Sequence, residues 1–334
     1  MNYKKLVSKL GKVSIELKLS EKNLENLPVG KSKLGGCPDV PDGFEWPYYE
    51  GLNYKDEIES RPLAFLAQIN LDDIKKYDIE NLLPNRGILY FFYEMEAMTW
   101  GYKLEDKGSA RVYYYDGDLA DLKPRKLADD VWEYLEVYEN NLEFIPRIDI
   151  PGVEDLPELV DDVDELIYED ESGKYEDDYM YDMLYRRFRS EILSLDINDK
   201  GEGIEFMVDD IIKSQYEADY TEDELEELEE VQMNKILGYA NVVQNSMLQE
   251  CELINRGIEC GDDCLDEYMA EYDKLDKDEL KVEVKKWRLL LQLDCETEDF
   301  PVEFDDCGSL YFYIKEDDLK SRNFDNIWCI LQCY

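Results

Sequence analysis

Two glutamines interrupt apolar stretches of this sequence and are well placed to do chemistry. Gln68 lies in FLAQIN and Gln292 in LLLQLD, and an amide or acid, Asn70 or Asp294, follows each glutamine by two residues. A buried side-chain amide needs hydrogen-bond partners. We therefore expect these glutamines either to face a shared cleft between two halves of the chain or to bridge backbone groups where the halves meet.

Three more residues join this candidate set. Gln244 also lies beside apolar residues, Trp46 adds a large side chain to a loop rich in Gly and Pro, and Tyr239 follows a glycine that interrupts a predicted helix. The candidate binding residues are Trp46, Gln68, Asn70, Tyr239, Gln244, Gln292 and Asp294.

The chain contains no histidine. This excludes Ser–His–Asp and Cys–His catalysis, and it excludes zinc and iron sites that depend on imidazole. Neither Cys251, Cys260 and Cys264 nor the pair Cys329 and Cys333 has the C-x2-C spacing of a cysteine zinc site. We assign no catalytic residue, no metal ligand and no cofactor, and whether the protein is an enzyme stays open.

One acidic stretch begins like a calcium-binding loop. Asp196 is followed by Asn198 and Gly201, but Lys200 takes the fifth position and Met207 the twelfth, where a liganding oxygen and a glutamate are needed. The sequence therefore contains no EF-hand. Weak, unspecific binding of a divalent cation by clustered carboxylates stays an alternative.

The charge balance is extreme, with 37 basic and 82 acidic residues and a net charge of −45. Such a surface repels phosphate backbones and anionic lipids, so we expect neither a nucleic-acid nor a membrane partner. A basic protein partner is its natural complement. No apolar run approaches the length of a membrane span and the N-terminus lacks the features of a signal peptide, so we expect a cytoplasmic location.

The elements that must position the candidate residues come in two related sets. Residues 62–69 are an apolar run that precedes the strand 88–93, which contains Gly87–Phe91 (GILYF), and residues 287–294 precede Gly308–Phe312 (GSLYF). The alternating patterns of residues 12–19 and 110–115 predict two further strands. We therefore predict an α+β fold with an internally duplicated, mostly antiparallel β scaffold.

Helices are expected between the two β sets. Residues 151–230 contain 30 acidic and 6 basic residues, and the helical periodicity there continues from Thr221 to Ile236. A second acidic helix is expected over residues 262–279, and residues 281–293 are assigned to the sheet. The predicted organisation is one domain over 1–334, with related β units over 1–150 and 281–334 and an acidic helical insertion with connecting helices over 151–280. The oligomeric state is not predicted.

Short segments along the chain form a specific combination: Ser32–Gly36, Glu45–Pro47, Pro62–Leu71, Gly87–Phe92, Leu237–Tyr239, Leu290–Asp294, Gly308–Phe312 and Gln332–Tyr334. In these segments the chain resembles the YwqG-like family of bacterial proteins, a domain of unknown function. The resemblance implies an α+β fold with internal duplication but no established reaction or ligand. Asn234 stands where relatives commonly have a histidine, so a reaction that used this histidine would be lost here.

The sequence supports three functional hypotheses. The first is a non-enzymatic protein-binding module, such as an immunity-like inhibitor of a basic partner, because the net charge is −45 and the sequence has no recognisable catalytic constellation. The resemblance adds a contextual indication, since some relatives are associated with toxin–immunity gene clusters. The alternative is an enzyme or small-ligand-binding protein that uses a polar cleft between the duplicated halves. The third is a regulatory adaptor that docks partners through the acidic insertion.

Overall fold

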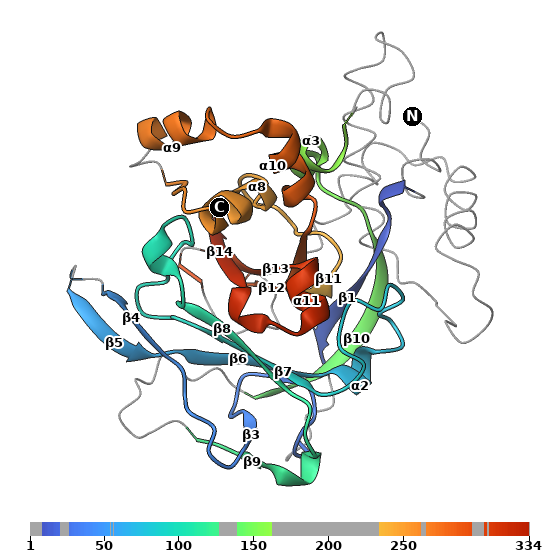
Figure 1. Ribbon diagram of the computed structural model, residues 1–334. Coiled ribbons are helices and arrows are strands. Elements are labelled where there is room, and N and C mark those ends of the chain that lie inside the picture. The colour runs from blue at the N-terminus through green and yellow to red at the C-terminus, as the bar shows by residue number, and fades with distance from the viewer. Residues whose placement is uncertain are drawn as a thin grey trace, which may run out of the picture.

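The computed structural model describes residues 9–20, 27–53, 55, 57–126, 139–161, 234–261, 265–295, 304–305 and 307–333. Within these ranges, one ten-stranded antiparallel sheet curls into a nearly closed, barrel-like shape (Figure 1). The strand order is β14-β13-β12-β11-β1-β10-β2-β6-β7-β8. The fold is therefore α+β, with the helices packed outside an antiparallel sheet.

The ten strands are β1 (Lys12–Leu19), β2 (Lys33–Leu34), β6 (Ala64–Asn70), β7 (Ile88–Tyr93), β8 (Ala110–Tyr115), β10 (Asn140–Asp149), β11 (Lys235–Leu237), β12 (Trp287–Asp294), β13 (Gly308–Lys315) and β14 (Trp328–Cys333). Two small sheets pair β3 (Asp39–Pro41) with β9 (Leu122–Pro124) and β4 (Tyr48–Leu52) with β5 (Ile58–Pro62). The described α-helices are α2 (Leu71–Ile74), α3 (Leu156–Leu159), α8 (Leu248–Asn255), α9 (Leu265–Tyr272), α10 (Lys277–Val284) and α11 (Glu316–Ser321). The short 3-10 helices are η1 (Leu104–Asp106), η2 (Leu119–Asp121), η4 (Val153–Asp155) and η6 (Phe324–Asn326).

The interior of the curled sheet is the main hydrophobic core. Residues from both ends of the strand order meet there, because Phe91 of β7 packs edge-on against Phe312 of β13 with ring centroids 5.3 Å apart. Burying an aromatic side chain contributes roughly 1.5–3 kcal/mol relative to leaving it exposed. Burial of the apolar residues of these strands therefore holds the two ends of the sheet together.

A loop covers the edge strand β14. Leu331 N–H donates to the Trp100 carbonyl at 3.1 Å, and the Trp328 indole donates to the Gly101 carbonyl at 2.8 Å. Gly101 has φ +86°, and a Cβ there would lie 2.1 Å from the Cys329 carbonyl oxygen. Only glycine fits this close approach.

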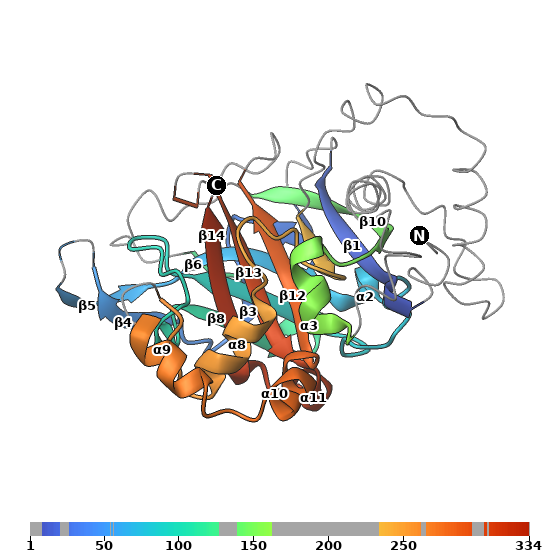
Figure 2. The same ribbon diagram turned by 90° about the horizontal axis from the view of Figure 1, so that it is seen from above.

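The outer faces of the two three-stranded ends carry different covers. Helices α3, α8 and α10 lie against β12–β14, where Leu253, Leu280 and Tyr313 belong to one buried cluster (Figure 2). The loop after β3 covers β6–β8, with the Phe44 ring stacked on the Phe92 ring at 6.1 Å. Each end of the sheet is thus packed on both faces.

Several sequence predictions are confirmed at element level. The strands predicted at 12–19, 88–93 and 110–115 are β1, β7 and β8. The candidate residue Asn70 caps α2, since its side chain accepts from Asp72 N–H at 3.0 Å.

Two predictions are wrong. Residues 235–237 are a strand instead of the end of a helix, because they fill the position between β1 and β12 in the sheet. Lys281–Val284 continue α10 instead of starting a strand, since Asp276 caps that helix and Leu280 and Val284 share its buried face. Residues 162–233, most of the predicted acidic insertion, lie outside the described ranges.

Candidate functional site

Gln68 is the centre of a buried polar network beside β2. Its Oε1 accepts from Asp39 N–H at 2.7 Å, and its Nε2 donates to the Lys31 carbonyl at 2.8 Å and to Asp39 Oδ2 at 2.9 Å. The Tyr90 hydroxyl donates to the Asp39 carbonyl at 2.6 Å. The amide therefore holds the loop after β2 against the sheet through backbone groups.

Neighbouring residues extend this network. Lys33 Nζ lies 3.4 Å from Asp39 Oδ1 and 3.1 Å from Glu139 Oε2, although the lysine is buried. Asn70 N–H donates to Ser32 Oγ at 2.9 Å. We call the set Ser32, Lys33, Asp39, Gln68, Asn70 and Tyr90 the first corner.

A second corner lies beside β11. Gln292 Oε1 accepts from Asn241 N–H at 2.9 Å, and the Tyr311 hydroxyl donates to the Asn241 carbonyl. Asp294 N–H donates to Asn234 Oδ1 at 2.8 Å. The second corner consists of Asn234, Lys235, Asn241, Gln292, Asp294 and Tyr311.

A buried ion pair completes the second corner. Lys235 Nζ lies 2.7 Å from Asp149 Oδ2, and both side chains are at most 1% exposed. The same carboxylate oxygen accepts from Tyr239 N–H at 3.0 Å. The lysine charge is thus neutralised by a carboxylate from β10, two strands away in the sheet order.

The two corners have the same strand register. Lys33 lies opposite Gln68, which lies opposite Tyr90, and Lys235 lies opposite Gln292, which lies opposite Tyr311. An irregularity interrupts the register just before each glutamine, between Phe65 and Ala67 and between Leu289 and Leu291. Asp39 and Asn241 each follow their lysine by six residues and use the same backbone atoms.

The predicted glutamines do not line one cleft. Gln68 shares its register position with Tyr90, which belongs to the outer cluster of β6–β8, and Gln292 shares its position with Tyr311 of the outer cluster of β12–β14. Paired residues of an antiparallel sheet point to the same face. The geometry therefore fits the second interpretation, in which the amides bridge backbone groups.

The other candidate residues also make internal contacts. The Trp46 indole donates to the Leu63 carbonyl at 2.9 Å, and the Tyr239 hydroxyl donates to the Leu10 carbonyl at 2.8 Å. Gln244 is exposed, but its Nε2 donates to the Cys333 carbonyl at 2.8 Å. Tyr239 joins the second corner through Asp149, whereas Trp46 lies in the outer cover of β6–β8.

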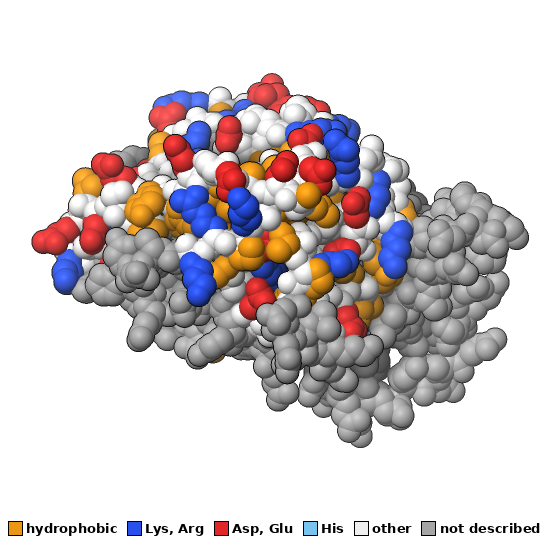
Figure 3. Space-filling view, turned by 90° about the horizontal axis from the view of Figure 1, so that it is seen from below, with side chains coloured by type: hydrophobic (Ala, Val, Ile, Leu, Met, Phe, Trp, Pro, Cys, Tyr) orange, Lys and Arg blue, Asp and Glu red, His pale blue; other side chains and the backbone are white. Residues whose placement is uncertain are grey.

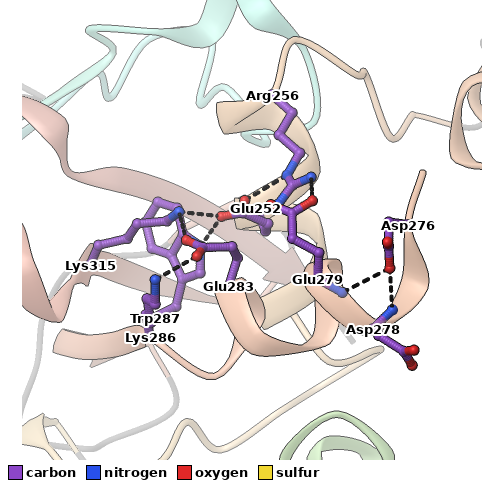
Figure 4. Close-up of polar contacts among 9 residues, drawn as sticks. All are labelled: Glu252, Arg256, Asp276, Asp278, Glu279, Glu283, Lys286, Trp287 and Lys315. Carbon is purple, nitrogen blue, oxygen red and sulfur yellow. Dashed lines mark hydrogen bonds and ion pairs between the residues drawn. The ribbon is translucent and has the colours of Figure 1, made fainter.

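Sequence reasoning missed a charged network on the helical side. Glu252 of α8 is buried, and its Oε1 accepts from Arg256 Nε at 2.7 Å. Its Oε2 accepts from the Trp287 indole at 3.0 Å and lies 2.7 Å from Lys315 Nζ (Figure 4). Lys315 also lies 3.1 Å from Glu283 of α10. These contacts fasten α8 and α10 to β12 and β13. The sequence feature that could have indicated this network is Glu252 itself, a glutamate inside the apolar run of α8.

A carboxyl cluster at the start of α8 was also missed. Glu158 Oε2 accepts from Gln249 N–H at 3.1 Å. Burial, with a smaller contribution from neighbouring carboxylates, raises the pKa of Asp155 to about 6, of Glu158 to about 7 and of Glu250 to about 8. Among the described residues, no group of three His, Cys, Asp or Glu side chains is arranged to hold a metal ion.

Large apolar side chains are exposed along one side of the molecule. We define the hairpin side by Tyr48, Leu52, Ile58, Trp100, Leu104, Leu265 and Met269. The β4–β5 hairpin contacts η1 through a 3.0 Å hydrogen bond from the Tyr49 hydroxyl to the Glu105 carbonyl, and η1 contacts Glu259 near α9 through Leu104 N–H at 3.1 Å. Figure 3 shows hydrophobic and acidic side chains together at the left, where β4 and β5 protrude in Figure 1.

A family profile described as Domain of unknown function (DUF1963) matches residues 32–333. The chain belongs to the DUF1963 family. This match confirms the membership that the YwqG-like words predicted, and it spans both corners. The comparison with curated proteins finds no match. Within the described ranges, every helix of this DUF1963 member is too short or too polar to cross a membrane.

Proposed function

We propose that this protein is a non-enzymatic protein-binding module that takes a basic partner on the hairpin side, as an immunity-like inhibitor would. The observation that carries this proposal is a two-stranded hairpin whose outward face is apolar and acidic. Ile58 is 73% exposed and Tyr48 is 52% exposed, and Glu50 on the same hairpin is exposed as well. Exposed apolar side chains that gather on one side of a protein mark an interaction surface.

The hairpin is held firmly by buried polar contacts. Arg61 Nε lies 3.2 Å from Glu94 Oε1, and the Arg61 guanidinium also donates to the carbonyls of Gly51 at 3.2 Å and Leu52 at 3.0 Å. Glu94 accepts from the N–H of Glu96 at 2.8 Å. A pre-ordered surface loses less conformational entropy on binding, so this anchoring favours a docking role for the hairpin.

The chemistry of the surface defines the partner. Tyr48, Leu52 and Ile58 supply apolar anchors; the exposed Glu50 lies between Tyr48 and Leu52 on the same face of β4, and the exposed Glu57 precedes Ile58. Aromatic and aliphatic anchors with a charged rim are typical of protein interfaces, and complementary charge speeds association. A partner with exposed apolar residues among lysines and arginines fits best. The cytoplasmic location and a single domain over 1–334 belong to the same proposal.

The matched corners support the proposed internal duplication. Lysine, glutamine and tyrosine occupy the same register positions in both corners. In each corner the N–H of Asp39 or Asn241 bonds to the glutamine, and the carbonyl of the same residue bonds to the tyrosine. We infer that the β units over 1–150 and 281–334 are related copies. Their polar residues serve the scaffold, which leaves the surface to carry the function.

One observation favours the alternative of a small-ligand or catalytic site. Glu158 and Glu250 have pKa values raised to about 7 and about 8 by burial, and carboxyls with such pKa values are suited to proton transfer near neutral pH. The variant Glu250→Gln distinguishes the two functions. A binding module keeps its partner affinity in this variant, whereas a proton-transfer site loses its activity.

The experiment compares three immobilised full-length proteins in lysate of the native host. The wild type, Leu52→Ser/Ile58→Ser and the control Val282→Ser are washed at low and at high salt; Val282 is exposed on α10, away from the hairpin. We expect a basic protein on the wild type and the control. After purification, it should bind the hairpin variant at least about tenfold more weakly, a loss of about 1.4 kcal/mol. Equal affinity for all three proteins, or no basic protein at low salt, would contradict the proposal.

A further inference from the structure

Three cysteines gather at one end of the β12–β14 strands. Cys295 directly follows β12, Cys307 directly precedes β13, and Cys333 ends β14. Cys295 N–H donates to the Gly308 carbonyl at 3.4 Å, and Gly308 lies opposite Cys333 in the sheet. The strand ladder therefore brings together residues that a long connection separates in the sequence.

Cys295 and Cys307 are neighbours at the base of the connection between β12 and β13. Cys295 pairs with Gly308 through the hydrogen bond just described, and Gly308 directly follows Cys307. Cys333 Sγ contacts the Phe304 carbonyl at 4.0 Å and is buried. The turn is constrained around these thiols, because Gly308 N–H donates to the Phe304 carbonyl at 2.7 Å.

The thiols of Cys295 and Cys307 differ in their access to solvent. Cys307 is exposed, whereas Cys295 is half-buried against the main core. Burial, with the neighbouring Asp294 carboxylate, raises the pKa of the Cys295 thiol to about 12. An external reagent therefore meets Cys307 first, and Cys295 lies beside it to react second.

We propose that Cys295 and Cys307 are a thiol–disulfide exchange site that reacts with small disulfides such as oxidised glutathione. The Cys307 thiolate attacks one sulfur of the small disulfide, which breaks the S–S bond and releases one thiolate. Cys295 then gives up its proton and attacks the Cys307 sulfur, and the second thiolate leaves. Two protein thiols are oxidised, and one small disulfide is reduced to two thiols.

The arrangement favours this pair over the third thiol. Cys295 pairs in the ladder with Gly308, the residue next to Cys307, so only a small approach of the two thiols is needed to reach disulfide geometry. Cys333 is shielded from a dissolved reagent by its burial. Formation of the bond closes the connection between β12 and β13 at its base, which removes conformational freedom from the unfolded chain. The oxidised protein should therefore have the higher melting temperature.

The test titrates the full chain with mixtures of oxidised and reduced glutathione under native conditions. Remaining thiols are alkylated, and peptides are mapped by mass spectrometry without reduction. We expect one dominant cross-link, Cys295 to Cys307, with loss of the mass of two hydrogen atoms and full reversal by dithiothreitol. The melting temperature should rise on oxidation of the wild type and of the control Cys37→Ser.

Variants distinguish exchange from simple modification. Cys295→Ser should stop at a stable glutathione adduct on Cys307, and Cys307→Ser should give neither the adduct nor the cross-link at this end of the sheet. Circular dichroism of each reduced variant verifies that it is folded. The proposal is overturned if the folded wild type accumulates the glutathione adduct without a cross-link, if another cysteine pair dominates, or if cross-linking requires denaturant.

Discussion

Lys235 and Asp149 place a full charge pair where almost no solvent reaches it, with both side chains at most 1% exposed. Removing one partner from such a pair leaves the other charge without compensation in a medium of low dielectric constant. The pair connects β11 to β10 across β1, so it affects the stability of the middle of the sheet.

We predict that Lys235→Met lowers the free energy of unfolding by about 3–5 kcal/mol. The double variant Lys235→Met/Asp149→Asn should recover part of this loss, because no unpaired buried charge remains. Urea unfolding followed by circular dichroism measures both values. A double variant that is less stable than either single variant would argue against a charge-pair origin.

Gln68 offers a second prediction at this scale. Gln68→Leu removes the partners of Asp39 N–H and of the Lys31 carbonyl, and each buried group left without a partner costs about 1–3 kcal/mol. The expected loss of stability is therefore about 3 kcal/mol. Gln244→Leu, at an exposed glutamine, should cost less than about 1 kcal/mol. Similar losses in the two variants would show that the network around Gln68 is not needed.

At the scale of elements, the packing of α3 against the start of α8 depends on protonation. Glu158 and Glu250 have pKa values raised to about 7 and about 8, above those of an unfolded chain. Between the unfolded and folded pKa values the folded state binds more protons at these two groups. Their contribution to stability is therefore highest at low pH and is lost as the pH rises toward about 8.

We predict that Glu250→Gln flattens this dependence. Its free energy of unfolding should fall less than that of the wild type between about pH 5 and pH 8, because the amide needs no proton to be buried neutral. Urea titrations at several pH values in constant salt give the two curves. Parallel curves for the two proteins would mean that Glu250 is ionised throughout this range.

The β4–β5 hairpin gives a prediction for a single element. Arg61→Met leaves the buried Glu94 without its guanidinium and frees the carbonyls of Gly51 and Leu52. Amide hydrogen exchange of residues 48–62 should then accelerate by at least about tenfold, while exchange in β7 and β13 stays unchanged. A uniform acceleration across the sheet would instead indicate global destabilisation.

The elements also show what sequence patterns can predict. The alternating patterns predicted β1 and β8, and the aromatic, β-branched pattern predicted β7, because such residues favour strands wherever the sheet buries them. β11 could not be assigned in this way. It has only three residues, and its strand conformation comes from the neighbours on either side of it.

In the candidate site, too, some features could be predicted from the sequence and others depend on the fold. Gln68 and Gln292 have equivalent register positions in the sheet, but the sequence could not indicate which face they occupy, since irregularities before each glutamine shift the side-chain alternation. The hairpin side has no sequence signature, because exposed apolar residues look like core residues until the fold places them.

At the scale of the whole molecule, the net charge of −45 sets the response to salt. Repulsion among like charges destabilises a compact state, and the screening length falls to about 3 Å at 1 M salt. We predict that the melting temperature rises when sodium chloride is increased from low to high concentration. Calorimetry at fixed pH measures the shift, and a melting temperature that falls with salt would show that attractive ion pairs, such as those around Glu252, outweigh the repulsion.

The crossing of β14 by the Trp100–Gly101 loop has a consequence for how copies of this chain behave together. A sheet that is not fully closed has two outer strands, and an uncovered outer strand can recruit the same strand of another molecule. Because Leu331 N–H is already occupied by the Trp100 carbonyl, one of these contacts is blocked from within the chain. A bulkier residue at position 101 would displace the Trp100–Gly101 loop from β14. Concentrated solutions of such a variant should form β-rich aggregates, while the parent chain stays dispersed.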